Sequence, residues 1–232
     1  MAFKGVLFDF SGTLFRIEPV TAWLRAALDE TGVSVGQDEF ERYARELDEA
    51  GALPGGSTPQ RIPESLAELW STRDEHAERH RAAYVGLARQ VGLPDPRLYD
   101  ALYERHMAPR AWHPYPDAAE VLGELRRRGA GVAVVSNIGW DPRPVFRAHG
   151  LDAYVDAYVL SYRHGVQKPD PRLFRAACEA LGQDPKDVLM VGDDRHADGG
   201  AAKLGCAVRF VDHLPVDERP GGLRPVLGLV GV

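Results

Sequence analysis

The sequence predicts an α/β fold in which a doubly wound parallel sheet carries an inserted helical domain. Short apolar runs recur along the chain, and they lack the alternation of half-exposed strands, as parallel strands buried on both faces require. Helical stretches separate the later runs. After the first run comes a long segment, residues 16–112, that has helical periodicity and no buried-strand run.

The predicted strands are the apolar runs, at residues 6–10, 132–135, 158–160, 188–191 and 207–211. Helices are predicted from apolar spacing and from flanking Pro and Gly residues at 116–128, 142–149, 171–181 and 197–204. Strand and helix therefore alternate through the second half of the chain. We expect residues 1–15 and 113–232 to form one core domain.

Residues 16–112 form the predicted helical domain, with helices at 21–30, 37–50, 64–91 (as one helix or a broken one) and 96–107. The Gly- and Pro-rich stretch 51–63 is predicted to be a mobile loop. Trp23 and Trp70 have apolar neighbours and are expected inside this domain. His76 and His80 are four residues apart and could share a metal ion, but their charged flanks favour a solvated face.

The net charge of −6 argues against a nucleic-acid-binding protein, which would have a basic surplus. No apolar run approaches the roughly 18 residues that a membrane helix needs. The N-terminal apolar stretch is too short for a signal peptide. We therefore expect a cytoplasmic monomer or homodimer that binds neither nucleic acid nor membrane. Cys178 and Cys206 are expected to be reduced, buried thiols.

Polar residues follow three of the predicted strands, at the sheet edge where open parallel sheets bind ligands. Asp9 follows the first run, Ser136 and Asn137 follow the second, and Asp193 and Asp194 follow the fourth, with Asp198 shortly beyond. Two carboxylate clusters at one edge need a cation, or one of them must hold a proton. Oxygen ligands of this kind suit Mg²⁺, which favours carboxylates, waters and substrate phosphate.

Four stretches in order, FDFSGTL (8–14), VVSN (134–137), QKPDPRLF (167–174) and VGDDRHADGGAAKLG (191–205), resemble the four motifs of the haloacid dehalogenase (HAD) superfamily. The helical segment 16–112 resembles the C1-type cap of that family. The resemblance implies a Rossmann-like core and a Mg²⁺-dependent hydrolase. Within the superfamily, the chain most resembles phosphatases and their dehalogenase relatives. The expected substrate is a small phosphorylated metabolite, which the cap would enclose.

The resemblance also implies roles for single residues. Asp9 matches the nucleophile that forms an aspartyl-phosphate, and Lys168 matches the lysine that neutralises nucleophile and phosphate. The implied catalytic residues are Asp9, Ser11 and Lys168. The implied phosphate-binding residues are Gly12, Thr13, Ser136, Asn137 and Lys168. The implied metal-site residues are Asp9, Ser11 through its carbonyl, Asp193, Asp194 and Asp198.

Ser11 departs from the family pattern, because phosphatases of the family usually carry Asp there as the general acid and base. Losing such a group typically lowers turnover by 10²–10⁴-fold. Three hypotheses remain open. The chain is a phosphatase that is slow, limited to good leaving groups, or supplied with a proton from elsewhere, for which His113 is a candidate. It is a 2-haloacid dehalogenase, with Arg16 as a candidate for gripping the halide. Or it is a ligand-binding protein without turnover. A phosphonatase is disfavoured, because residues 16–112 contain no Lys for a Schiff base.

Overall fold

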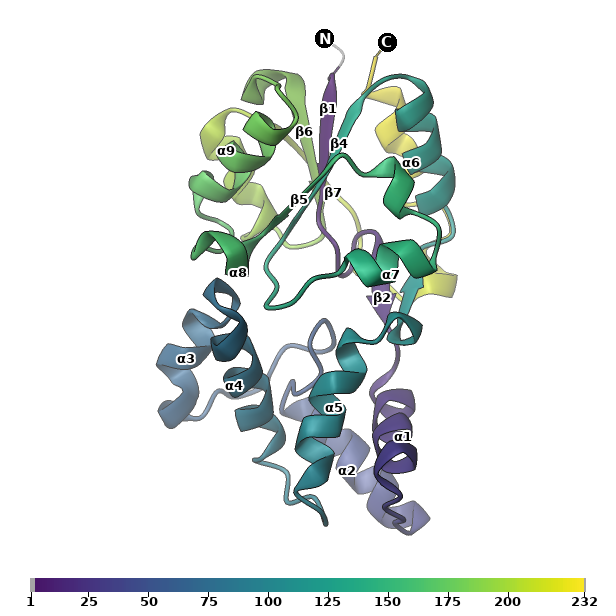
Figure 1. Cartoon of the computed structure of the whole chain (residues 1–232), viewed down its shortest axis with the longest axis vertical. Coiled ribbons are helices and arrows are strands. Elements are labelled where there is room, and N and C mark those ends of the chain that lie inside the picture. The colour runs from purple at the N-terminus through teal and green to yellow at the C-terminus, as the bar shows by residue number, and fades with distance from the viewer. Residues whose placement is uncertain (1–2, 232) are drawn as a thin grey trace.

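The computed structural model describes residues 3–231 and has at its centre a five-stranded sheet in the order β5-β4-β1-β6-β7. Every neighbouring pair of these strands is parallel. The strands are β1 (Gly5–Phe8), β4 (Gly131–Ser136), β5 (Ala157–Leu160), β6 (Val188–Gly192) and β7 (Ala207–Phe210). All five predicted strands are present, so the predicted fold class is confirmed (Figure 1).

Helices cover both faces of this sheet. Successive strand residues point to opposite sides and therefore pack against different helices. Val6 belongs to the apolar cluster that includes α6 (Ala118–Arg127), whereas its neighbour Leu7 belongs to the cluster that includes α9 (Pro171–Ala180). Figure 1 shows α6 and α9 on opposite sides of the sheet. Burial on both faces explains why the strands read as continuous apolar runs.

The remaining core helices differ in detail from those predicted. The helix predicted at 142–149 is α7 (Arg143–Ala148), and a short helix that we did not predict, α8 (Ser161–His164), follows β5. The stretch predicted as helix at 197–204 is a 3₁₀ helix, Asp198–Leu204. Its two glycines, Gly199 and Gly200, weaken the preference for a regular α-helix.

A helical insert, defined here as residues 18–111, lies against the edge of the core at which the parallel strands end (Figure 1). Its helices are α1 (Val20–Thr31), α2 (Gln37–Glu49), α3 (Ala67–Ser71), α4 (Ala77–Ala88) and α5 (Arg97–Met107). The predicted helix 64–91 is broken, since a 3₁₀ turn at Arg73–Glu75 separates α3 from α4. Trp23 is buried and donates from Nε1 to the Leu102 carbonyl at 2.8 Å, which confirms its predicted place in the interior.

Two short strands that the sequence reasoning missed join the insert to the core. β2 (Phe15–Ile17) pairs antiparallel with β3 (Trp112–Pro114), with Ile17 opposite Trp112. The expectation that residues 16–112 contain no strand is therefore wrong at both ends of that segment. Three residues are too few to show strand periodicity.

The first part of the loop 51–63, predicted to be mobile, packs into the interior. Residues 51–54 are buried, and Arg16 donates from Nη1 to the Gly55 carbonyl at 2.7 Å. Cys178 and Cys206 are buried free thiols, as expected, with their sulfurs 3.9 Å apart. Among residues 3–231, none of the helices has the length and apolar character needed to cross a bilayer.

Candidate active site

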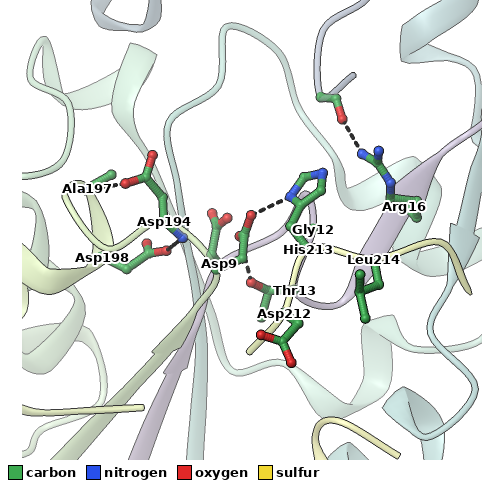
Figure 2. Close-up of polar contacts among 12 residues, drawn as sticks. Asp9, Gly12, Thr13, Arg16, Asp194, Ala197, Asp198, Asp212, His213 and Leu214 are labelled. Atoms are coloured by element: carbon green, nitrogen blue, oxygen red, sulfur yellow. Dashed lines mark hydrogen bonds and ion pairs between the residues drawn. The ribbon is translucent and has the colours of Figure 1, made fainter. Parts of the chain in front are cut away.

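Three carboxylates from separate parts of the chain meet at the carboxyl edge of the sheet. Asp9 follows β1, Asp193 follows β6, and Asp198 begins the 3₁₀ helix beyond it. One oxygen from each lies within 4.8 Å of the others. Figure 2 shows Asp9 beside the turn that carries Asp198. An all-oxygen donor set at this spacing suits a hard divalent cation such as Mg²⁺.

Lys168 links two of these carboxylates. Its Nζ lies 2.8 Å from an Asp9 oxygen and 2.6 Å from an Asp198 oxygen, and the residue is only 4% exposed. Burial opposes the charge on Lys168, but Asp198 and Asp9 outweigh it and raise its pKa. Burial, together with the nearby Asp198 and Asp193 carboxylates, raises the pKa of Asp9 to about 7 against the opposing effect of Lys168. A bound cation would favour the ionised form of Asp9.

Asn137 fixes the position of Lys168 through the backbone. Its Oδ1 accepts from the Lys168 amide at 2.6 Å, and its Nδ2 donates to the Lys168 carbonyl at 3.0 Å. Both polar ends of the Asn137 side chain are therefore engaged with the chain at Lys168. Ser136, the other predicted phosphate-binding residue of this motif, is buried and lines the cavity above the carboxylates.

Asp193 has two side-chain partners. Thr13 donates from Oγ1 to one carboxylate oxygen at 3.0 Å, and His213 Nδ1 lies 2.5 Å from the other. Burial disfavours the charge on Asp193, but the His213 contact and the charge of Lys168 outweigh it and lower the pKa. Figure 2 shows His213 on the side of the cluster away from Asp198. Thr13, which the motif resemblance predicts to bind phosphate, orients Asp193 through its hydrogen bond.

The backbone after Asp9 is held from inside the protein. Gly12 adopts φ +80° and donates its amide to the Phe15 carbonyl at 2.7 Å, so this amide is engaged within the protein. The buried Arg219 donates to the carbonyls of Gly12, at 2.7 Å, and of Thr13. These contacts fix the loop that presents Asp9 and Ser11.

Asp194, predicted at the metal site, caps a turn. Its Oδ1 accepts from the amide of His196 at 2.7 Å. It also accepts from the amide of Ala197 at 2.9 Å (Figure 2). Its own amide donates to Asp198 Oδ2 at 3.0 Å, which orients the neighbouring carboxylate. Asp194 lies outside the group of three carboxylates that can share one ion.

A cavity of about 380 Å³ separates these groups from the helical insert. Ser11 lies at its floor with a buried Oγ that has no hydrogen-bond partner among residues 3–231. Gly55 of the insert approaches this oxygen. A Cβ on Gly55 would lie 2.7 Å from Ser11 Oγ and 2.8 Å from the Trp112 ring, and its φ is +79°. Only glycine fits this close approach.

The insert contributes the opposite wall of the cavity, with Trp70, Arg73, Asp74, His80 and Tyr84. His76 is exposed as predicted, but the prediction is wrong for His80, which is buried and bonds through Nδ1 to the Tyr103 hydroxyl at 2.7 Å. Trp70 is partly buried and faces the cavity, so it is only partly an interior residue.

The family of the chain follows from its motifs and from comparison with known proteins. A model of haloacid dehalogenase-like hydrolases matches residues 3–205. The chain belongs to this family. The hydrolase is 32% identical to a phosphoserine phosphatase of Thermus thermophilus, over 96% of this chain and 90% of the relative. It is 31% identical to (S)-2-haloacid dehalogenase 4A of Burkholderia cepacia, over 87% and 80% respectively.

Solved structures show the same two kinds of relative. A dehalogenase with an intermediate complex is 27% identical to the hydrolase, with a TM-score of 0.65 over 91% of this chain and 85% of that chain. A HAD phosphatase from Thermococcus onnurineus has a TM-score of 0.58 over 99% and 100% of the two chains. At 24% sequence identity, this similarity supports the same fold and nothing about function.

Two residues considered for catalysis lie outside the cavity of the hydrolase. Arg16 and His113 lie opposite each other in the β2–β3 pair and line a separate groove, whose walls come from both the insert and the core. The structure therefore does not bring a halide-gripping Arg16 or a proton-donating His113 to the carboxylates. Sequence reasoning missed Tyr84, Trp140 and His213. His213 could have been found, because it follows β7 as Asp9 follows β1.

Proposed function

We propose that this hydrolase is a Mg²⁺-dependent phosphatase that cleaves a small phosphorylated metabolite through an aspartyl-phosphate on Asp9. The observation that carries the proposal is the grouping of Asp9, Asp193 and Asp198 around one point, with the Lys168 ammonium between two of them. A site that concentrates carboxylates and one buried lysine is suited to an anionic substrate only with a further cation. The phosphoserine phosphatase relative supports the same reaction class.

The proposed Mg²⁺ site consists of Asp9, the Ser11 carbonyl and Asp193, with Asp198 and Asp194 close by. When bound, the ion would neutralise charge on the phosphate and on Asp9, which otherwise repel each other. The side chains of Asp9 and Lys168 would carry out the phosphoryl transfer itself. The Asp9 carboxylate attacks phosphorus and the bond to the leaving oxygen breaks, while Lys168 stabilises the added negative charge. Ser136 lines the cavity where the phosphoryl oxygens would lie.

We further propose that the helical insert acts as a C1 cap, with residues 16–112 as the cap domain and residues 1–15 and 113–232 as the core domain. The insert covers the carboxylates and leaves a cavity of about 380 Å³, which fits a small metabolite and excludes a macromolecule. Closing such a site removes water and strengthens the electrostatic contacts inside it. As part of the same proposal, the protein is a cytoplasmic monomer or homodimer.

The missing acid at position 11 leaves the source of the leaving-group proton open. Ser11 has no carboxyl group, so we propose that the enzyme is slow with alkyl phosphates and faster with esters of acidic alcohols, whose oxygen leaves without a proton. The dehalogenase relative and the dehalogenase structures favour carbon–halogen hydrolysis as the second candidate. Against it, Arg16 lies outside the cavity, and three grouped carboxylates are more than a metal-free reaction needs.

The proposal is tested by phosphate release from acetyl phosphate and p-nitrophenyl phosphate with and without Mg²⁺. We expect release that depends on Mg²⁺ and is lost in Asp9→Asn, with Asp187→Asn on the distant surface as a matched control. Metal-independent chloride release from a 2-haloacid would favour the dehalogenase. Absence of both reactions, together with tight binding of phosphate, would favour a ligand-binding protein without turnover.

A further inference from the structure

The roof of the active-site cavity carries a carboxylate without a hydrogen-bond donor. Asp74 lies in the 3₁₀ turn Arg73–Glu75, is 3% exposed and lines the cavity. Within residues 3–231, no group donates a hydrogen bond to its carboxylate oxygens. The two approaching nitrogens, Arg73 Nη2 at 3.5 Å and His80 Nε2 at 3.7 Å, are too far away to do so. Burial raises the pKa of the Asp74 carboxyl group, and the nearby Arg73 guanidinium opposes that rise, so the carboxylate would be stabilised further by a ligand that donates a hydrogen bond to it.

Two contacts from the core hold the backbone of the turn that carries Asp74. Ser161 in α8 of the core donates from Oγ to the Asp74 carbonyl at 2.5 Å. Gln167 donates from Nε2 to the Ser71 carbonyl at 2.7 Å, two residues before the turn. The turn is therefore docked on the core at both of these points, where Asp74 lines the cavity.

Arg73 offers a positive charge beside this carboxylate, and part of its bonding capacity is unused. Its guanidinium stacks on the Trp70 ring at 3.9 Å, and its Nη1 donates to the Trp70 carbonyl at 2.8 Å. Its Nε is buried without a partner among the described residues. His80 contributes no charge, because burial lowers its pKa well below the ordinary value. The roof thus presents one anion and one cation, next to each other and not hydrogen-bonded to each other.

We propose that Asp74 and Arg73 recognise a leaving group that carries both an ammonium and a carboxylate, so that the substrates are phosphate esters of small hydroxylated amino acids. This inference rests on the phosphatase function proposed above. The phosphate would lie at Asp9 and Lys168 on the floor of the cavity. The ammonium would donate to Asp74, and the carboxylate would accept from Arg73.

The charge pattern of the roof selects against other phosphorylated metabolites. A leaving group without an ammonium leaves the Asp74 oxygens without a hydrogen-bond donor in a site from which the bound ligand has displaced water, and that costs binding free energy. An ammonium alone adds a second positive charge next to Arg73. A zwitterion meets both requirements, and the aromatic walls formed by Trp70, Tyr84 and Trp112 limit it to a small size.

Calorimetric binding of two non-hydrolysable phosphonates in the presence of Mg²⁺ tests this inference. 2-Amino-3-phosphonopropionate carries the ammonium, and 3-phosphonopropionate lacks it. We expect the wild-type protein to bind the amino compound roughly tenfold to a hundredfold more tightly. Asp74→Asn should abolish this preference. Glu75→Gln, a change in the same turn outside the cavity lining, should keep it.

The carboxylate contact is tested with 2-aminoethylphosphonate, which lacks the carboxylate. Wild-type protein should bind it more weakly than 2-amino-3-phosphonopropionate, and Arg73→Gln should remove that difference. Inorganic phosphate should bind all variants alike, which shows that the floor of the site is intact. Equal binding of the amino and des-amino compounds, with phosphate still bound, would overturn this inference and leave the phosphatase proposal standing. Absence of phosphate binding to wild type with Mg²⁺ would overturn both.

Discussion

We propose above that Ser11 replaces a general acid, and its hydroxyl lies between the nucleophile loop and Gly55 of the insert. Gly55 approaches so closely that the space beyond Ser11 Oγ is already taken by backbone and by the Trp112 ring. The small side chain and the close glycine are therefore matched to each other. Any larger residue at position 11 must displace the loop that contains Gly55.

We predict that Ser11→Asp raises the hydrolysis of alkyl phosphates by about tenfold or more, because it restores a general acid next to Asp9. The measurement is kcat/KM for an alkyl phosphate and for p-nitrophenyl phosphate, and the gain should be larger for the alkyl ester. Ser11→Asn is the matched control, since it displaces Gly55 to the same extent without adding an acid. Equal rates for the two variants would show that the proton comes from another group.

His106 makes the folded protein sensitive to acid. The residue is fully buried and its Nε2 has no partner among the described residues, and burial lowers its pKa from 6.5 to about 3. The unfolded chain therefore takes up a proton near pH 6.5, while the folded chain does not. Stability falls as the pH drops below about 6.5, at roughly 1.4 kcal/mol per pH unit, until the folded form is protonated near pH 3.

The prediction is that His106→Leu flattens the dependence of the free energy of unfolding on pH. Between pH 6.5 and 5 the wild type should lose about 2 kcal/mol through His106 alone, and the variant should not show this part of the loss. Urea unfolding at several pH values measures the slope, which does not depend on whether the substitution lowers stability overall. The exposed His76, changed to Gln, should leave the slope unaltered.

At the scale of elements, an ion pair ties the entrance of the insert to its last helix. Glu18, the residue after β2, accepts from Arg105 in α5, with Nε 2.6 Å from Oε1 and a second contact from Nη2, and both residues are buried. α1 and α5 lie side by side in Figure 1, so this pair closes the base of the helical insert.

Glu18→Gln is predicted to lower the free energy of unfolding by about 3 kcal/mol, because it leaves a buried guanidinium without its counterion. Replacing both residues, as Glu18→Leu with Arg105→Met, should cost less than the single change, since no buried charge remains. Urea unfolding followed by circular dichroism measures both. A double variant that is less stable than the single one would contradict this account of the pair.

At the scale of the whole molecule, two polar contacts hold residues 71–74 of the insert against the core. Ser161 Oγ serves both sides, because it donates to the Asp74 carbonyl and accepts from the Ile138 amide at 2.9 Å. The contact from Gln167 to the Ser71 carbonyl adds a second point. Removing either should weaken the closed arrangement without altering the carboxylates of the core.

We predict that Ser161→Ala accelerates amide hydrogen exchange in residues 71–76 and raises KM several-fold, with a smaller effect on kcat. The local opening free energy falls when a buried hydrogen bond of about 1 kcal/mol is lost. Ser71→Ala is the control, because Ser71 contributes only its carbonyl to the contact with the core. Unchanged exchange in Ser161→Ala would mean that apolar packing alone holds the insert closed.

The sequence allowed the core and its carboxylate edge to be predicted, because each buried strand is a continuous apolar run and the residue after it is placed by the sheet. Asp9 and Asp193 were found in this way. Asp74 could not be found so, since it lies in a charged stretch whose burial depends on docking against α8. The contact of Thr13 with Asp193 also depends on tertiary structure, because the two residues lie 180 positions apart in the sequence. The turn that Asp194 caps is local, but the sequence reasoning assigned that carboxylate to the metal site.

The antiparallel pairing of Ile17 with Trp112 means that the chain leaves the core and returns to it at adjacent points. A tight turn between these strands would close the polypeptide with the intervening 94 residues absent, that is, with 18–111 removed. Evolution can thus replace or reshape the whole helical insert without disturbing the carboxylates of the active site, because the core sheet sets their spacing. Transferring the helical insert between related proteins is therefore a direct way to change substrate preference while the catalytic residues of the core stay the same.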